Sequence, residues 1–559
     1  MSQASPGPIT LAHTMMDVPL TLAGLARRAA DRFGHVEIVS RRPDRSLHRT
    51  TYAAVIERAH GLARALLGAS IGKGQAVATL MWNNAAHLEA YFGIPLAGAV
   101  VHTLNLRLHP DDIAFIADDA GDRMLIVDEV LVPLAQKVIA TLPEGRRFER
   151  VFVANRGDVT AALPAGMEDY EAFIAAAPSD VALPTLDEND ALGCCYTSGT
   201  TGRPKGVVYS HRSTILHSIV SALPDSLALS RRDTLMPVVP MFHVNAWGLP
   251  YTAALVGAKQ VHPGPFLDAP SLLELMQSEK VTCAAGVPTL WLAIREVLDR
   301  DPTAYKLMPG LRMIVGGSAA PESLIRDFDR LGLTLLHAWG MTETSPIGLV
   351  SKLTPESDDA GEAEHYRLRA TQGVPPPLVE VRVRNDAGNV PDDGSTSGEL
   401  QVRGPWVAGR YSSGRNADAV RAETAAKWTD DGYFRTGDVA RIDKYDFVQL
   451  TDRIADLIKS GGEWIASAEL ETALMGHPAV LEAAVIGVPH PRWSERPLAA
   501  VVWKPGQSAT AAELAAFLGA RFAKFWIPDA FDVVDAIPRT SAGKFKKTEL
   551  RERYKNWQW

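Results

Sequence analysis

One stretch of the sequence combines residue types that can hold a phosphate group. In residues 190–223, the apolar run LGCCY leads into a loop rich in Ser, Thr and Gly that carries Lys205, and the helix-like run STILHSIVSAL follows. Backbone N–H groups in such a loop can surround an anion, and hydroxyls and a lysine supply further donors. The spacing from Gly199 does not fit the Walker A pattern. By itself, this composition indicates either a phosphate site of another kind or an ordinary turn.

Size and composition indicate a soluble globular protein of several domains. At ~150 residues per domain, the 559 residues correspond to roughly three to four domain equivalents. Hydrophobic residues make up 46% and charged residues 22%, which excludes a largely disordered or fibrous chain. The 57 Lys and Arg against 65 Asp and Glu leave a net charge of −8, which argues against a protein that mainly wraps nucleic acid.

Cysteine usage and hydropathy point to the cytoplasm. Cys194, Cys195 and Cys283 are odd in number and two are adjacent, so they make neither a disulfide framework nor a spaced zinc site. The N-terminus has no charged start followed by an apolar core, so we expect no secretory signal. The apolar stretch 91–104 contains Pro95 and is shorter than the ~18 residues of a membrane span, so we expect no transmembrane segment.

Helix-like stretches alternate with short apolar runs along the chain. Residues 20–34 and 52–70 are examples of the first, and residues 76–82 and 122–128 of the second. This alternation is typical of α/β layers.

Three later segments differ from this alternation in composition and periodicity. Residues 351–373 are polar and acidic, which predicts an exposed loop, and residues 383–404 alternate turn signals with apolar runs, as β-hairpins do. A helix pattern begins at Ser467 and stops at Gly476. A separate C-terminal unit of about a hundred residues fits the usual domain size.

Five motifs together resemble the adenylate-forming superfamily, which includes acyl-CoA synthetases, luciferases and peptide-synthetase adenylation domains. They are YTSGTTGRPKG (196–206), HAWGMTET (337–344), RTGD (435–438), TDRIADLIKSGGEWIASAELE (451–471) and PRTSAGKFKK (538–547). They follow the family's order over nearly the whole chain. The resemblance is greatest to bacterial medium- and long-chain fatty-acyl-CoA synthetases.

The resemblance implies a nucleotide site. Lys205 and its loop match the part that holds the ATP β- and γ-phosphates, and Thr342 matches a contact to the α-phosphate. Glu343 matches the carboxylate that binds Mg²⁺, a hard cation that prefers oxygen ligands. Asp438 matches the ribose contact. The residues implied to bind ATP or AMP are Thr197, Ser198, Gly199, Thr200, Thr201, Gly202, Lys205, Gly317, Trp339, Thr342, Asp438 and Arg453.

The resemblance also implies two half-reactions, adenylation of a carboxylic acid and transfer of the acyl group to CoA. Lys544 matches the lysine that reaches the carboxylate and the α-phosphate during adenylation, where a placed cation offsets developing negative charge. Lys459 matches a lysine implicated in the second step. The CoA contacts implied are Ser460, Gly461, Gly462 and Trp493. Alternation between the steps implies rotation of a C-terminal lid about Ala455, where many relatives have Asp or Lys.

The acid is predicted from the string PMFHVNAWGLPY (240–251). His243 matches a residue near the carboxylate, which makes it a further catalytic candidate, and Trp247 matches a ring that gates a fatty-acid tunnel. The predicted acyl pocket comprises His243, Val244, Trp247, Gly248 and Met341. Very similar strings occur in ligases for short thioether acids such as 3-methylmercaptopropionate, and an aryl acid is a further alternative.

The expected architecture follows from the same resemblance. Residues 1–450 form an N-terminal AMP- and acyl-binding domain of helix-covered sheets, with a small β-rich subdomain near 375–450. Residues 451–559 form a mobile α+β lid. ATP, CoA and a small carboxylic acid are the expected partners, nucleic acid is not, and a homodimer is possible. Carrier-protein ligases, luciferase-like oxygenases and a non-catalytic adenylate-binding scaffold are the competing interpretations.

Overall fold

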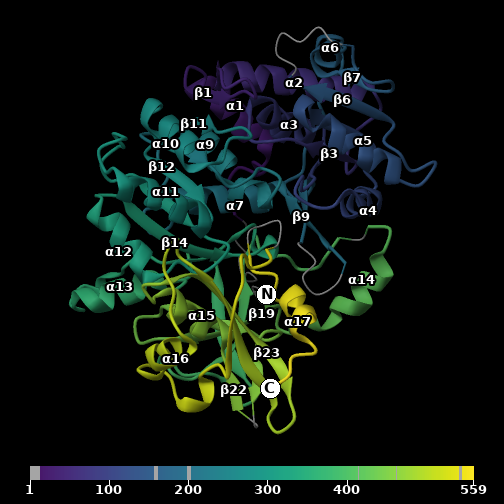
Figure 1. Cartoon of the computed structure of the whole chain (residues 1–559). Coiled ribbons are helices and arrows are strands. Elements are labelled where there is room, and N and C mark those ends of the chain that lie inside the picture. Colours follow the sequence, from purple (N-terminus) through teal and green to yellow (C-terminus); the bar gives the residue numbers. More distant parts are fainter. Residues whose placement is uncertain (1–12, 156–161, 198–202, 413, 461–462, 540–543) are drawn as a thin grey trace, which may run out of the picture.

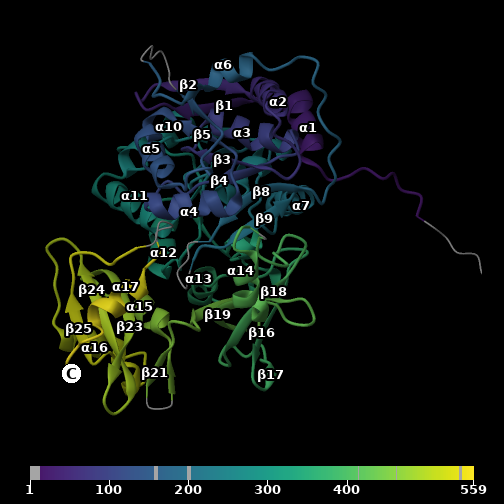
Figure 2. The same ribbon diagram turned by 90° about the vertical axis from the view of Figure 1, so that its right-hand side faces the viewer.

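The computed structural model describes residues 13–155, 162–197, 203–412, 414–460, 463–539 and 544–559. These residues form four β-sheets with helices packed on them. Two large sheets and their helices make up the upper part of Figure 1, in purple to teal. The two smaller sheets lie below and side by side in Figure 2. The predicted α/β class, with a large helix-covered part followed by a smaller C-terminal part that contains strands, is confirmed.

The first large sheet has seven strands in the order β7-β6-β5-β3-β4-β8-β9, and every neighbouring pair is parallel except β8 and β9. Parallel strands need crossover connections, which explains the alternating helical and apolar runs. The strands are β3 (Ala76–Leu80), β4 (Val100–Thr103), β5 (Met124–Asp128), β6 (Arg150–Ala154), β7 (Glu168–Asp169), β8 (Ala191–Tyr196) and β9 (Gly206–Ser210). The helices in this stretch are α2 (Tyr52–Gly68), α3 (Ala85–Leu96), α4 (Pro110–Ala120), η1 (Glu129–Leu131), α5 (Val132–Thr141) and α6 (Tyr170–Ala175).

The second large sheet has eight strands in the order β15-β14-β13-β12-β10-β11-β1-β2, with a parallel centre and an antiparallel strand at each edge. Its strands are β1 (Glu37–Arg41), β2 (Leu47–Thr51), β10 (Thr234–Pro237), β11 (Lys259–His262), β12 (Cys283–Gly286), β13 (Arg312–Val315), β14 (Thr334–Gly340) and β15 (Ile347–Val350). The accompanying helices are α1 (Leu22–Phe33), α7 (His211–Ala222), α8 (Val244–Trp247), α9 (Leu249–Val256), α10 (Ala269–Ser278), α11 (Pro288–Arg300), α12 (Glu322–Arg330), η2 (Thr342–Thr344), η3 (Pro355–Ser357) and α13 (Glu362–Ala370).

The largest core cluster joins these two sheets through α3. Every residue of α3 is buried, and the cluster includes side chains of both sheets, such as Val77 of β3 and Ile314 of β13. A helix that is apolar all round must be buried on all sides. The apolar stretch 91–104 is therefore the end of a core helix followed by the buried strand β4.

A five-stranded antiparallel sheet, ordered β17-β16-β18-β19-β20, forms the predicted β-rich subdomain. It contains β16 (Glu380–Asn385), β17 (Gly388–Asn389), β18 (Gly398–Arg403), β19 (Phe434–Ile442) and β20 (Val448–Arg453), with α14 (Ala417–Thr424) and η4 (Ala425–Lys427) between β18 and β19. The hairpins predicted in residues 383–404 are confirmed by β16, β17 and β18. The predicted domain boundary at residue 450 falls inside β20.

The last sheet belongs to residues 454–559, which we call the C-terminal region. It contains β21 (Ile458–Ser460), β22 (Glu463–Ile465), β23 (Val480–His490), β24 (Ser494–Trp503) and β25 (Ala530–Val533). Its helices are α15 (Ser467–Met475), α16 (Ala511–Gly519), η5 (Lys524–Trp526) and α17 (Lys547–Tyr554). The helix predicted to begin at Ser467 is confirmed.

Two local expectations differ from the structure. Residues 351–373 were predicted to be a loop, but they include α13. Acidic residues in its first turn and arginines in its last turn complement the helix dipole, and its one buried residue, Leu368, anchors it. The phosphate-loop motif does not run directly into α7, because strand β9 intervenes and pairs with β8. Within the described ranges, no helix combines the length and the apolar character that crossing a bilayer requires.

Candidate active site

A cavity of about 550 Å³ is lined by residues from both large sheets, the β-rich subdomain and the C-terminal region. Segments hundreds of residues apart in the sequence meet there because parallel strands end at a common edge of each sheet. The predicted site residues on its wall are Thr197, Lys205, His243, Val244, Trp247, Gly317, Trp339, Met341, Thr342, Glu343, Arg453, Ala455 and Lys544. An adjoining cavity of about 360 Å³ shares Gly317, Trp339, Arg453, Ala455 and Lys544 with it and adds Asp438.

The predicted phosphate loop connects the two strands of a hairpin. The Thr197 N–H donates to the Lys205 carbonyl (2.9 Å), and the Lys205 N–H donates to Thr197 Oγ1 (3.1 Å), so the β8–β9 ladder extends to both ends of the loop. Both residues line the cavity. The predicted contacts Ser198, Gly199, Thr200, Thr201 and Gly202 lie outside the described residues.

Asp438 connects three strands beside the adjoining cavity. Trp339 Nε1 donates to Asp438 Oδ2 (3.1 Å), and Arg453 Nε pairs with Asp438 Oδ1 (3.1 Å). Asp438 and Arg453 are direct cross-strand partners on β19 and β20, which explains the short distance. The negative charge of Asp438 is the largest cause of the raised pKa of Arg453. An added Cβ at Gly348 would lie 2.5 Å from the Trp339 ring, so that glycine leaves room for the indole.

Thr342 and Glu343 lie in η2, a short helix directly after β14, and both are buried. The Tyr411 hydroxyl donates to Glu343 Oε1 (2.6 Å), and the Tyr209 hydroxyl donates to the Thr342 carbonyl (2.9 Å). A charge-assisted hydrogen bond of this kind orients a carboxylate. Neither tyrosine was predicted to belong to the site. Tyr411 lies 68 residues from its partner, in a loop without a local pattern that indicates the contact.

Lys544 enters the cavity from the C-terminal region. Arg539 and Phe545 form an antiparallel bridge, and the Lys546 N–H donates to the Pro538 carbonyl (2.7 Å). These contacts hold residues 538–539 beside residues 545–546, next to Lys544. Burial of the ammonium group, followed by the repulsion of Arg453, lowers the pKa of Lys544 to about 8, although Asp438 and Glu343 oppose this.

The charges of two cationic side chains act on His243. Burial, then Lys544 and then Arg107, lower its pKa to about 4, so the imidazole is neutral at pH 7. A neutral imidazole can donate one hydrogen bond and accept another. Arg107 also lines the cavity, and burial lowers its pKa. Arg107 was not predicted as a site residue, because it follows β4 in the run LNLRL and has no neighbouring motif.

Apolar side chains make up a large part of the cavity wall. Besides Val244 and Trp247, this wall includes residues that were not predicted: Leu227, Val238, Val239, Phe242, Val287, Leu290, Ile314 and Ile347. The Trp247 ring lies against Gly316, where an added Cβ would be 3.0 Å from it.

The turn that presents Trp247 is left-handed. In α8 the φ angle is positive at every residue from Val244 to Trp247, and Gly248 continues it at φ 69°. Such a conformation costs roughly 1–2 kcal/mol for each residue that has a Cβ. Gly248, also predicted for the acyl pocket, is not among the residues that line the cavity. It lies against His217, where an added Cβ would be 2.8 Å from the ring.

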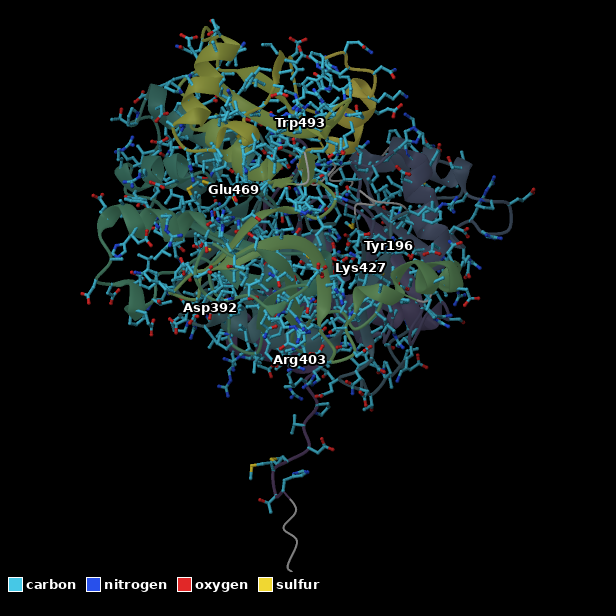
Figure 3. The ribbon with its side chains drawn as sticks, turned by 90° about the horizontal axis from the view of Figure 1, so that it is seen from below. Tyr196, Asp392, Arg403, Lys427, Glu469 and Trp493 are labelled. Atoms are coloured by element: carbon cyan, nitrogen blue, oxygen red, sulfur yellow. The ribbon has the colours of Figure 1, made fainter. Side chains whose placement is uncertain are left out.

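Of the predicted CoA residues that the structure describes, none lines the cavity. Lys459 lies over the Trp464 ring at 4.7 Å, and Ser460 Oγ accepts a hydrogen bond from Arg496 (2.8 Å). Trp493 is 39% exposed, and Figure 3 shows it on the C-terminal region. Gly461 and Gly462 lie outside the described residues.

Two family models match separate parts of the chain. Residues 25–412 match the model of the AMP-binding enzymes, and residues 469–544 match the C-terminal domain of AMP-binding enzymes. The first match contains most of the residues that line the cavity, and the second contributes Lys544.

Similar proteins match this chain over nearly the full length of both chains. A "Long-chain-fatty-acid--CoA ligase" of Thermus thermophilus is 48% identical over 97% of each chain, and a "3-methylmercaptopropionyl-CoA ligase" of Ruegeria pomeroyi is 42% identical over 97% of this chain and 98% of that one. The solved structure of the anthranilate CoA ligase AuaEII with anthranoyl-AMP has the same fold, with a TM-score of 0.82, 24% identity, and 97% and 98% of the two chains covered. This chain belongs to the AMP-binding enzyme family.

Proposed function

We propose that the protein is an AMP-forming acid–CoA ligase. It joins a carboxylic acid to ATP, with release of pyrophosphate, and then exchanges AMP for the thiol of CoA. One observation carries the proposal: a lysine, a buried carboxylate and the ends of a Ser/Thr/Gly loop share one cavity with an apolar pocket. This combination suits activation of an apolar acid by a nucleotide.

In the first step, a carboxylate oxygen of the acid attacks the α-phosphorus and pyrophosphate leaves. Negative charge builds on the phosphoryl oxygens, and Lys544 stabilises it from the C-terminal side. Lys205 and the loop donors hold the departing pyrophosphate. Asp438 accepts hydrogen bonds from the ribose, and Trp339 flanks the adenine. His243, neutral at pH 7, positions the acid without adding charge.

Glu343 fits a role in binding Mg²⁺. Mg²⁺ in nucleotide sites is held by one or two carboxylates together with substrate phosphates. Glu343 supplies one buried carboxylate on the cavity wall, oriented by Tyr411. Bound there, Mg²⁺ would supply positive charge to the phosphate oxygens.

The second step needs a different arrangement, because Lys459, Ser460 and Trp493 lie away from the cavity. Rotation of the C-terminal region about Ala455 would withdraw Lys544 and bring the strip 459–462 to the acyl-adenylate. Ala455 lies on the wall of both cavities, directly after β20, which suits a hinge. CoA then attacks the acyl carbon as its thiolate, and AMP leaves.

We infer that the acid is a medium- or long-chain fatty acid. The apolar wall and the similarity to the Thermus thermophilus ligase support this choice. The similarity to the Ruegeria pomeroyi ligase favours a short thioether acid as the second candidate. The test is AMP and thioester formation with ATP, Mg²⁺ and CoA over straight-chain, short thioether and aryl acids. A peak at medium or long chains supports the first candidate, and no AMP with any acid contradicts the proposed enzyme.

Trp247→Ala should change the selection among acids. Removal of the ring widens the apolar wall beside Gly316, so the ratio of kcat/KM for a bulky acid to that for a short acid should rise about tenfold. Pyrophosphate release without CoA measures this ratio. Trp493→Ala, which alters an exposed side chain outside the cavity, should leave it unchanged. An unchanged ratio in Trp247→Ala would exclude the ring from acid selection.

The pH profile of adenylation should report Lys544. Its pKa is about 8 in the ligand-free protein, so the ammonium is charged below that pH and neutral above it. Therefore kcat/KM for pyrophosphate release should fall as the pH rises through about 8, because kcat/KM reports free-enzyme pKa values. Lys544→Arg, whose guanidinium stays charged, should be slower but lack this alkaline limb. If the limb persists in Lys544→Arg, another group causes it.

A further inference from the structure

Two polar contacts cross the proposed hinge and meet on one helix. Asp452, three residues before Ala455, accepts hydrogen bonds from the Ser467 N–H and from Ser467 Oγ, the latter at 2.7 Å. Arg441 of β19 forms an ion pair with Glu469. Ser467 and Glu469 both lie in the first turn of α15. Figure 3 shows Glu469 on the C-terminal region, near its boundary with the rest of the molecule.

Asp452 belongs to a buried chain of hydrogen bonds that continues into the C-terminal region. The Lys547 ammonium donates to Ser467 Oγ (2.7 Å) and pairs with Glu471 Oε1 (2.7 Å). The Ser467 hydroxyl can therefore donate to Asp452 while it accepts from Lys547, with opposite charges at the two ends. Asp452, Ser467, Glu471 and Lys547 are each less than 9% exposed.

The chain of contacts ends close to the reacting group. Lys547 begins α17 and lies three residues after Lys544. Position and orientation of α17 therefore set where the segment with Lys544 enters the cavity. Rotation about Ala455 would separate Asp452 from Ser467 and Arg441 from Glu469, because each pair has one member on either side of the hinge. Lys547 and Glu471 would stay together.

We propose that Asp452 and Arg441 form a latch on α15 that holds the C-terminal region in the adenylating orientation, with Asp452 acting through Ser467 and Lys547 to position Lys544. This inference rests on the proposed two-step function. The latch is made only in the first orientation, so it stabilises adenylation selectively and has to open before CoA reacts. Asp452 and Arg441 are positioning residues and contact no substrate.

The C-terminal region offers a matched control. Arg551 Nη2 pairs with Asp456 Oδ1 (2.6 Å), and both residues lie after Ala455. This ion pair resembles the latch in chemistry and depth but would rotate with the region, so it has no reason to favour one orientation. Arg551→Ala therefore measures the effect of losing an ion pair in α17 that does not span the hinge.

The experiment compares Asp452→Ala, Arg441→Ala, the double variant and Arg551→Ala in both half-reactions. Adenylation is measured as single-turnover pyrophosphate release, and transfer as thioester formation from preformed acyl-adenylate and CoA. We expect Asp452→Ala to slow adenylation about tenfold or more, and the double variant to slow it further, with transfer changed less than about twofold. Arg551→Ala should leave both within about twofold. Asp452→Asn keeps one acceptor oxygen and should restore part of the rate.

A structural readout separates this proposal from the proposed function. Spin labels on Asp392→Cys and Val533→Cys, both at exposed positions on opposite sides of the hinge, report the orientation without turnover. The inter-label distance should shift or broaden in Asp452→Ala and stay as in the parent in Arg551→Ala. Equal losses in both half-reactions, or an unchanged distance distribution, would overturn the latch. Should Asp452→Ala not fold, Ser467→Ala breaks the same chain and should give a smaller loss, confined to adenylation.

Discussion

Lys544→Met is expected to reduce the rate of acyl-adenylate formation by about two to three orders of magnitude. The substitution removes the cation that is proposed to reach the α-phosphate from the C-terminal region, while leaving an apolar chain of similar length. Loss of such preorganised stabilisation costs ~3 to 4 kcal/mol in the transition state. Single-turnover pyrophosphate release measures it.

Two comparisons make this prediction specific. Lys546→Met alters a half-exposed lysine two residues further on, which pairs with Glu549, and should change adenylation little. Thioester formation from preformed acyl-adenylate should be nearly unaffected in Lys544→Met, because the lysine is proposed to leave the cavity before CoA enters. A comparable loss in both half-reactions would contradict a role restricted to adenylation.

Glu343→Gln is expected to lower adenylation about 100-fold and to raise the Mg²⁺ concentration needed for half-maximal rate. The amide retains the shape of the side chain and an oxygen that can accept from Tyr411, but it loses the charge that a hard cation requires. A Mg²⁺ titration of pyrophosphate release gives both quantities.

Tyr411→Phe is the matched control for Glu343. It keeps the carboxylate and removes the hydroxyl that donates the 2.6 Å hydrogen bond. A hydrogen bond to a charged group contributes about 1.5–3 kcal/mol when buried and less when the partner can turn to another donor. We therefore expect a smaller loss of about tenfold. A Mg²⁺ requirement that stays unchanged in Glu343→Gln would exclude this carboxylate as the ligand.

Local sequence patterns were sufficient to predict several of the helices. The helices near residues 20–34 and 52–70 and the helix that begins at Ser467 follow from apolar spacing and from breakers at their ends. The α13 helix was missed because its apolar content is low. Its stability depends on acidic residues in its first turn and arginines in its last turn, which complement the helix dipole, and on one buried leucine. Strand β9 was missed because it is short and pairs only with β8.

The motif residues of the candidate site were also accessible from the sequence, because the loop, the η2 pair, Asp438 and Lys544 each stand in a recognisable string. Gly248 shows the limit of such strings. It lies within the acyl motif, yet it supports a left-handed turn against His217 and does not line the cavity. A motif indicates which residue type stands at a position. Only the backbone structure shows whether that residue lines the cavity or, like a glycine, permits a positive φ angle.

The sequence by itself determined the α/β class, the family and the chemical groups for adenylation, because helix and strand periods and contiguous motifs are local properties of the chain. Only the tertiary structure decided that Tyr411 orients Glu343, that the charges of Arg107 and Lys544 act on His243, and that Asp452 is linked to Lys547 through Ser467. These contacts join residues 15 to several hundred positions apart. Their strength comes from burial and mutual orientation, which arise only when the sheets and the C-terminal region are packed together.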